Sequence, residues 1–210
     1  MKPIYKYILG IFIMADAWTT VTTKRKRDEK KTPCIEIIKK AKDPIELIHP
    51  LNDTWVCWYH ILESDNWDIS CYQTLLIFNT AEDFWILMNN ISNVNNGMYY
   101  IMRQGYPPMW DHEANLEGGG WTFKIDKKFA QEFWTKLACF CVGETLSLHP
   151  NNITGISISP KVRFVTFRIW TKNTNRDPTE FNNIKKETEN DSLSINFENA
   201  RFVPNSDALR

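Results

Sequence analysis

The sequence predicts one α+β domain, in which a single antiparallel sheet carries helices on one face. Short segments rich in aromatic and β-branched residues alternate with turns of Asn, Gly, Pro and Asp, which is typical of antiparallel strands. Two segments break this alternation and place apolar residues at helical spacing instead. Helices and strands that share a core form layers, so we expect one sheet covered by helices.

Seven segments are expected to form strands. They are TWVCWYHI (54–61), CYQTLLIF (71–78), GMYYIMRQ (97–104), WTFKI (121–125), ITGISIS (153–159), RFVTFRIW (163–170) and INFENARFVP (195–204). The stretch 172–194 is polar, so we expect a loop there with at most one short helix.

Two helices are expected from their ends and their spacing. The first follows Thr80, whose hydroxyl can accept a hydrogen bond from the first turn, and Asp83 stands three residues on, close to a capping box. The second follows Asp126 and ends at Gly143, since glycine commonly terminates helices. The apolar stripes are Phe84, Leu87, Met88 and Ile91 in the first, and Phe129, Phe133, Leu137 and Cys141 in the second.

The length of 210 residues suits one domain, which we place at residues 41–210 after a flexible tail at residues 1–40. The tail contains KRKRDEKK (24–31), with six basic and two acidic residues, or +4. The formal charge of the chain is zero, so the rest carries −4 and is not a basic clamp for nucleic acid. The run is either a solvated tail or a patch for nuclear localisation or RNA contact.

The first 17 residues allow two interpretations. They resemble a short secretory signal, with two lysines before the apolar run YILGIFIM (7–14) and the residues ADA (15–17) after it. Alternatively, Met14 opens an ordinary polar N-terminus, and the preceding residues are a tail or a misassigned start. The apolar run is too short to span a bilayer, and we expect a cytoplasmic protein with no membrane partner.

Five cysteines are an odd number without the spacing of a disulfide framework, so we expect reduced, mostly buried thiols. Cys139 and Cys141 form a close pair, but no second Cys/His pair stands at the spacing of a structural zinc site. We therefore expect neither a metal nor a cofactor. The cysteines are Cys34, Cys57, Cys71, Cys139 and Cys141.

The tryptophans fall into two groups by sequence context. Those within regular segments are expected in the core, where tryptophan is highly buried on average. Trp67 follows a polar turn and Trp110 follows PPM (107–109), so both are expected in loops, where rings often serve recognition. The core group is Trp55, Trp58, Trp121 and Trp134.

Carboxylates stand beside Trp110 in the stretch PMWDHEANLEGGGW (108–121). Two indoles and a carboxylate match N7-methylguanine, because the methylated base is a flat cation whose stacking gains a cation–π contribution. An ionised Asp111 only accepts hydrogen bonds, which suits the N1–H and N2–H₂ donors of guanine. Glu113 is the alternative acceptor.

Several motifs, in this order, resemble the eukaryotic translation initiation factor 4E family. They are HPLNDTWVCWY (49–59), TAEDFWILMNNI (80–91), PMWDHEANLEGGGW (108–121), the Trp and Gly-Glu of the second helix, and NARFVP (199–204). The resemblance implies a curved antiparallel sheet of about eight strands with three helices on its convex face. It also implies a slot for the mRNA 5′ cap on the concave side, and we expect a monomer.

By matching position, the resemblance assigns cap-binding roles. The residues are Trp67 and Trp110 for stacking on the base, Asp111 for reading guanine, Trp170 for the N7 methyl group, and Lys161 and Arg163 for the phosphates. Asp111 departs from the family, which uses Glu there, so a loop shift must offset the shorter arm or guanine is read less well. Gly120 stands where Arg or Lys is usual, and Thr166 replaces a further Lys.

The resemblance also implies a convex surface for a helical Tyr-x-x-x-x-Leu-apolar peptide of initiation factor 4G or a 4E-binding protein. Trp85 fits the family and would anchor the leucine of the peptide. Thr135 and Cys139 replace larger leucines. Lys136 replaces an acid that faces basic peptide residues, so the surface is shallower with reversed charge, unless Lys136 is simply a solvated helix residue. The matching positions are His49, Pro50, Ala81, Trp85, Thr135, Lys136, Cys139 and Gly143.

We therefore expect a translation factor that binds the 7-methylguanosine cap, recruits mRNA to the initiation machinery and catalyses nothing. One alternative is a repressor or scaffold with altered cap and partner specificity, which the missing basic residues favour. Another is an aromatic cage for a different cation, such as methylated lysine or choline. Catalysis by Asp111, His112 and Glu113 finds no support, because no histidine has a nucleophile motif, metal-pair spacing or phosphate loop nearby.

Overall fold

The computed structural model describes residues 48–181 and 200–209. The expected tail at 1–40, the signal-like start and most of the polar stretch 172–194 lie outside these residues. Within them, no helix is both long and apolar enough to cross a membrane.

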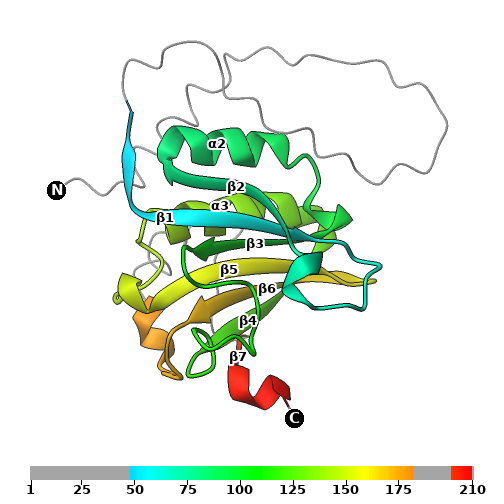
Figure 1. The fold of residues 1–210 in the computed structure, drawn as a ribbon, viewed down its shortest axis with the longest axis vertical. Helices are drawn as coiled ribbons and strands as arrows, with labels where there is room; N and C mark the ends of the chain where they lie inside the picture. Colours follow the sequence, from blue (N-terminus) through cyan, green and yellow to red (C-terminus); the bar gives the residue numbers. More distant parts are fainter. Residues whose placement is uncertain (1–47, 182–199, 210) are drawn as a thin grey trace.

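The described chain forms one seven-stranded sheet in which every pair of neighbours is antiparallel. The strands follow the order β2-β1-β3-β5-β6-β4-β7, from top to bottom in Figure 1. Their bounds are β1 Pro50–His60, β2 Gln73–Thr80, β3 Met98–Arg103, β4 Gly119–Asp126, β5 Ile153–Pro160, β6 Phe164–Thr171 and β7 Arg201–Pro204.

Side chains alternate between the two faces of the sheet, as strand geometry requires. In β1, Trp55, Cys57 and Tyr59 join the large core on one face, whereas Trp58 packs into a smaller apolar cluster on the other. That smaller cluster is built around the buried residues Tyr72, Met98, Tyr100, Met102 and Trp170. The second face is therefore partly apolar although neither α-helix of the described residues covers it.

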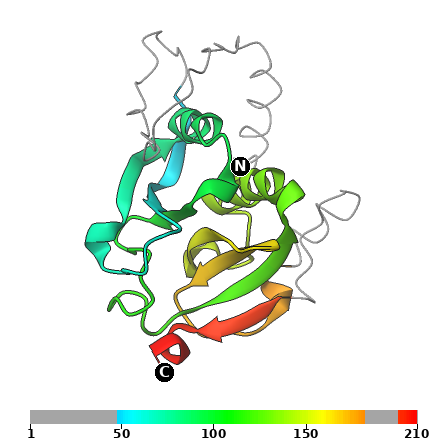
Figure 2. The ribbon, with the colours of Figure 1, turned by 90° about the vertical axis from the view of Figure 1, so that its right-hand side faces the viewer.

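Two α-helices cover the first face, α2 (Ala81–Asn90) and α3 (Ala130–Val142). Figure 2 shows both nearly end-on, on the same side of the sheet. Trp55 from β1 and Trp134 from α3 are fully buried between the layers, and Trp121 is nearly so. These three tryptophans confirm the core expectation, while Trp58 is only partly buried on the opposite face.

The ends of the helices follow the expected chemistry with two differences. Thr80 caps α2 by accepting a hydrogen bond from the backbone N–H of Asp83 at 3.1 Å. Asp126 instead caps a 3₁₀ turn at 127–129, so α3 begins at Ala130, three residues later than a helix capped by Asp126 would begin. Gly143 ends α3 but keeps a helical backbone, and the left-handed conformation falls on Glu144, with φ 55°.

The α+β fold class is confirmed, and all seven expected strands are present within a few residues except β7, which the structure describes only from Arg201. The described part has seven strands and two α-helices, against the eight and three implied by resemblance. Only two segments carry helical spacing, so a third helix has no residue pattern to support it there. Cys57, Cys71, Cys139 and Cys141 are free thiols, as expected.

Candidate functional site

The loop between β1 and β2 presents Trp67, whose side chain is 43% exposed. Asn66 and Asp68 shape this loop with short-range hydrogen bonds: the Asn66 side chain accepts from the N–H of Asp68 at 3.0 Å, and the Asp68 carboxylate accepts from the N–H of Ser70 at 2.9 Å. The first bond forms an Asx turn, and the second caps the 3₁₀ turn Ile69–Cys71. The indole therefore stands on a defined turn, as the sequence predicts.

One face of the Trp67 ring is already occupied by His60, the last residue of β1. The two rings are parallel within 7° and their centroids are 4.6 Å apart. His60 is fully buried, and its two ring nitrogens lie 2.8 Å from the carbonyl oxygens of Ile61 and Asn66. The His60 ring therefore supports one face of Trp67, while 43% of the tryptophan side chain stays exposed.

The second exposed indole, Trp110, is 40% exposed and lies in the loop from β3 to β4. Asn115 holds this loop from within, because its side-chain amide donates to the carbonyls of Pro107 at 2.7 Å and Met109 at 2.6 Å. Asn115 is buried, and its own carbonyl accepts from the buried Asn205 at 2.7 Å. The loop position therefore depends on residues at the C-terminal end of the described chain.

Asp111 is exposed next to Trp110 and close enough to act on Tyr72 electrostatically. Burial raises the pKa of Tyr72 to about 12, and the Asp111 carboxylate contributes to that increase. The Tyr72 ring also packs against His60, with centroids 4.8 Å apart. Tyr72 therefore packs against the ring that supports Trp67 and also lies within the electrostatic range of Asp111. These contacts do not include Glu113.

Trp170 lies in β6 and is buried, with 3% exposure, in the apolar cluster of the uncovered face. Its indole N–H donates to the hydroxyl of Ser157 at 2.9 Å, which fixes the ring plane. Lys161 and Arg163 are exposed in the tight turn between β5 and β6. That turn closes with the N–H of Lys161 donating to the carbonyl of Phe164 at 2.8 Å.

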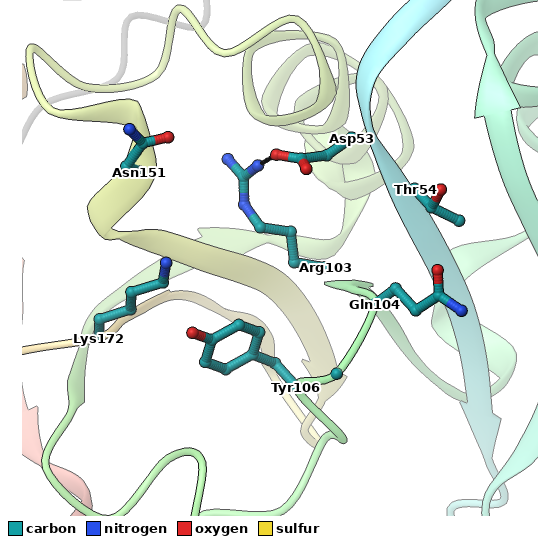
Figure 3. Close-up of a pocket in the computed structure, with 8 residues that line it drawn as sticks. Asp53, Thr54, Arg103, Gln104, Tyr106, Asn151 and Lys172 are labelled. Carbon is teal, nitrogen blue, oxygen red and sulfur yellow. Dashed lines mark ion pairs between the residues drawn. The ribbon is translucent and has the colours of Figure 1, made fainter.

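A separate cavity of about 510 Å³ lies beside the N-terminal half of β1, where β3 and β6 end and β5 begins (Figure 3). Arg103 in its wall forms ion pairs with Asp53 and Glu144, and its Nε donates to the carbonyl of Ile153 at 3.0 Å. The charge of this guanidinium is therefore satisfied within the protein. None of the expected cap-binding residues lines this cavity, so the cavity is not the cap site.

Comparison with known proteins gives the family. The family model described as "Eukaryotic initiation factor 4E" matches residues 50–210, which is most of the chain. The chain belongs to this family. It is 27% identical to the initiation factor 4E of Candida glabrata over 186 residues, covering 82% of this chain and 85% of that protein. It is 32% identical to initiation factor 4E-3 of Caenorhabditis elegans over 153 residues, covering 65% and 60%.

Solved structures of initiation factor 4E proteins have the same fold. The C. elegans factor 4E-3, solved with the 4E-binding protein Mextli and a cap analogue, superimposes with a TM-score of 0.66 at 25% identity, covering 78% of this chain and 96% of that one. The Ascaris suum factor 4E-3, solved with an m7G cap, gives 0.63 at 26% identity, covering 74% and 91%.

The expected partner positions of this factor 4E member lie at the start of β1 and on both helices. His49 joins β1 to α2, because its Nδ1 lies 2.6 Å from a carboxylate oxygen of Glu82 and its carbonyl accepts from the N–H of Ala81 at 2.9 Å. Trp85 is mostly buried, with 6% exposure. Pro50 is exposed beside His49.

The α3 positions are also largely packed. Thr135 is half-buried and donates its hydroxyl to the carbonyl of Gln131 at 3.1 Å, while Lys136 beside it is half-buried as well. Cys139 is buried, and burial raises the pKa of its thiol to about 12. Gly143 donates its N–H to the carbonyl of Cys139 at 3.0 Å.

Sequence reasoning missed the residues that support the site, above all His60, Asn115, Asn205 and Arg168. Alternation could have indicated two of them: His60 shares a strand face with Trp58, and Arg168 shares one with Trp170. Asn115 and Asn205 gave no such signal, because their contacts join positions 90 residues apart.

Proposed function

We propose that this initiation factor 4E family member binds the 7-methylguanosine 5′ cap of mRNA and recruits the mRNA to the translation initiation machinery. The observation that carries this proposal is the pair of exposed indoles on defined loops, Trp67 and Trp110, with the exposed Asp111 next to Trp110 in the sequence. Related factors solved with cap ligands support it.

Each residue has a distinct physical task in this proposal. The face of Trp67 opposite His60 and the ring of Trp110 hold the cationic base between them, where stacking and cation–π attraction add. Asp111 accepts from the guanine N1–H and N2–H₂ groups. The Trp170 ring contacts the N7 methyl group, and Lys161 and Arg163 meet the phosphates.

A fluorescence titration tests the proposal directly. Tryptophan emission is followed while 7-methyl-GTP or GTP is added to the protein. We expect saturable quenching by 7-methyl-GTP at concentrations far below those needed for GTP, because only the methylated base is a cation at neutral pH. Equal affinity for the two nucleotides would overturn the proposal. Tighter binding of trimethyl-lysine or choline would favour an aromatic cage for another cation.

The same protein is proposed to bind its ligand without transforming it and to act in the cytoplasm as a monomer. The described residues contain no group of three or more His, Cys, Asp or Glu side chains placed to hold a metal ion. Incubation of the protein with 7-methyl-GTP should return the nucleotide intact, and chromatographic detection of a cleaved product would contradict this.

The convex surface is proposed to bind a helical peptide of initiation factor 4G or a 4E-binding protein, as the Mextli complex of the related C. elegans factor suggests. Whether the result is activation or repression depends on that partner. A repressor or scaffold with weakened cap binding is the second candidate, because Gly120 and Thr166 stand where the family has basic residues. A cap affinity far below that of ordinary members would favour it.

A further inference from the structure

Arg168 carries a positive charge on the uncovered face of the sheet, and no carboxylate of the described residues forms an ion pair with it. Its Nη2 donates to two neutral oxygens, the carbonyl of Val203 at 3.1 Å and the side chain of Asn205 at 2.7 Å. Burial lowers its pKa to about 10, which still leaves the group charged near neutral pH. Its Nε is buried and has no hydrogen-bond partner among residues 48–181 and 200–209.

An uncompensated cation of this kind is costly unless an anion reaches it. The neutral oxygens of Val203 and Asn205 satisfy only part of the guanidinium, which has five N–H donors. Nη2 already uses both of its hydrogens and Nε is buried, so Nη1 is the nitrogen of this guanidinium that an anion can reach. A phosphate suits that position, because hydrogen bonds from a charged donor to an anion are the strong ones.

The position of Arg168 connects it to the proposed cap slot. Its guanidinium carbon lies 5.0 Å from the ring centroid of Trp170, two residues along the same face of β6. A two-residue step along a strand covers about 7 Å, so Arg168 lies between Trp170 and the turn that carries Lys161 and Arg163. Phosphates that run from a base at Trp170 toward that turn pass Arg168.

Gly120 makes this position available. A Cβ atom at residue 120 would lie 2.4 Å from Nε and 2.8 Å from Cζ of Arg168, so the Arg168 side chain crosses β4 over the glycine. The same Cβ would lie 2.8 Å from the backbone carbonyl oxygen of Ile169, so a variant at 120 also needs circular dichroism to check its fold. Gly120 is the position at which the family usually has Arg or Lys. The guanidinium thus occupies the space above the residue whose basic side chain this chain lacks.

We propose that Arg168 is a phosphate-binding residue of the cap site, supplying from β6 the positive charge that Gly120 does not supply from β4. This inference rests on the proposed cap binding and adds a residue specific to this chain. It predicts that Gly120 and Arg168 depend on each other, since a larger residue at 120 displaces the guanidinium.

The test compares two ligands, 7-methyl-GTP and the nucleoside 7-methylguanosine, which has no phosphate. For Arg168→Gln we expect the affinity for 7-methyl-GTP to fall about tenfold or more, as for loss of a charged hydrogen bond, with little change for the nucleoside. Arg168→Lys should retain most of the difference in affinity between 7-methyl-GTP and 7-methylguanosine, because it keeps the positive charge. The matched control is Arg176→Ala, which should change neither affinity. Arg176 packs on Phe202, which lies against the large core on the opposite face of the sheet.

Arg168 also holds Asn205, which supports the Trp110 loop, so a purely structural role must be separated. If the role of Arg168 is purely structural, Arg168→Gln should lower the affinity for both ligands equally, and this result would overturn the inference. An unchanged affinity for both ligands would overturn it as well. The double variant Gly120→Arg/Arg168→Ala places the cation on β4 instead, and it should restore the preference for 7-methyl-GTP that Arg168→Ala loses. If the unaltered protein binds neither ligand, the proposed function itself fails.

Discussion

The ring of His60 stacks on the inner face of Trp67, with 4.6 Å between centroids, and its nitrogens contact the carbonyls of Ile61 and Asn66 at both ends of the loop segment. The first prediction follows from this contact. His60→Ala should weaken 7-methyl-GTP binding by roughly 2- to 10-fold, because an aromatic pair contributes about 0.5–1.5 kcal/mol beyond area burial.

His60→Phe separates the two contributions of His60. It keeps a ring behind Trp67 but removes the contacts with the carbonyls, so we expect an affinity between those of the unaltered protein and His60→Ala. Asp65→Ala, at an exposed position of the same loop, is the control. If both His60 variants bind as the unaltered protein does, the ring has no part in positioning Trp67.

The second prediction concerns the stacking rings. Trp67→Ala or Trp110→Ala should reduce the affinity for 7-methyl-GTP by roughly 5- to 150-fold, since stacking of a base on an aromatic ring is worth about 1–3 kcal/mol. Both rings are about 40% exposed, at 43% and 40%, so the fold should survive the change. Fluorescence titration gives the affinity and circular dichroism checks the fold. An unchanged affinity in both variants would place the site elsewhere.

The third prediction concerns the exposed turn between β5 and β6. Lys161→Ala and Arg163→Ala should each weaken binding of 7-methyl-GTP and reduce its dependence on salt concentration, because each removes a charge-assisted contact that salt screens. Titrations at two ionic strengths measure both effects. If the unaltered protein binds 7-methylguanosine and 7-methyl-GTP with equal affinity, these side chains face away from the ligand.

The fourth prediction tests which carboxylate reads guanine. Asp111→Asn should cost about 1–3 kcal/mol of binding to 7-methyl-GTP, the usual worth of a bidentate base contact. Glu113→Gln is the matched control and should have little effect. Asp111→Glu restores the family residue and should bind at least as tightly as the unaltered protein. A larger loss in Glu113→Gln than in Asp111→Asn would reverse the assignment.

The fifth prediction concerns the partner surface. We expect weak binding of ordinary factor 4G peptides with basic flanks, and tighter binding of the same peptide when those positions are acidic, because Lys136 replaces an acid. Calorimetry with both peptides decides this, and Lys136→Glu should invert the preference. Trp85→Ala should abolish binding, with a melting curve to exclude unfolding because its ring is largely buried. A preference for the basic peptide in the unaltered protein contradicts the prediction.

Local sequence patterns predicted the sheet and the helices of this fold, because each strand and each helix depends on residues that are close in the sequence. Alternation located the strands, and Thr80 located the start of α2 through its bond to the N–H of Asp83. The pattern placed the start of α3 too early, because a residue such as Asp126 can cap a 3₁₀ turn as well as an α-helix. A side chain that caps one turn does not specify how the next turn continues.

The site was predictable only where exposure follows from local context. Polar or proline-rich flanks placed Trp67 and Trp110 in loops, and both rings are exposed. The residues that hold these loops in place were not predictable. Arg168 and Asn205, for example, form a hydrogen bond although they are 37 positions apart in the sequence. Only the pairing of β6, β4 and β7 brings these side chains together.

The path of the chain between β3 and β4 has a consequence for synthesis. β3 and β4 are separated in the sheet by β5 and β6, so the loop that carries Trp110 must span strands that follow it in the sequence. That loop receives its last buried anchor from Asn205, near the end of the chain. A growing chain therefore cannot fix the Trp110 loop until residue 205 has emerged, since such long-range contacts form late. Retention on a 7-methyl-GTP resin would thus select molecules that include Asn205 over shorter ones.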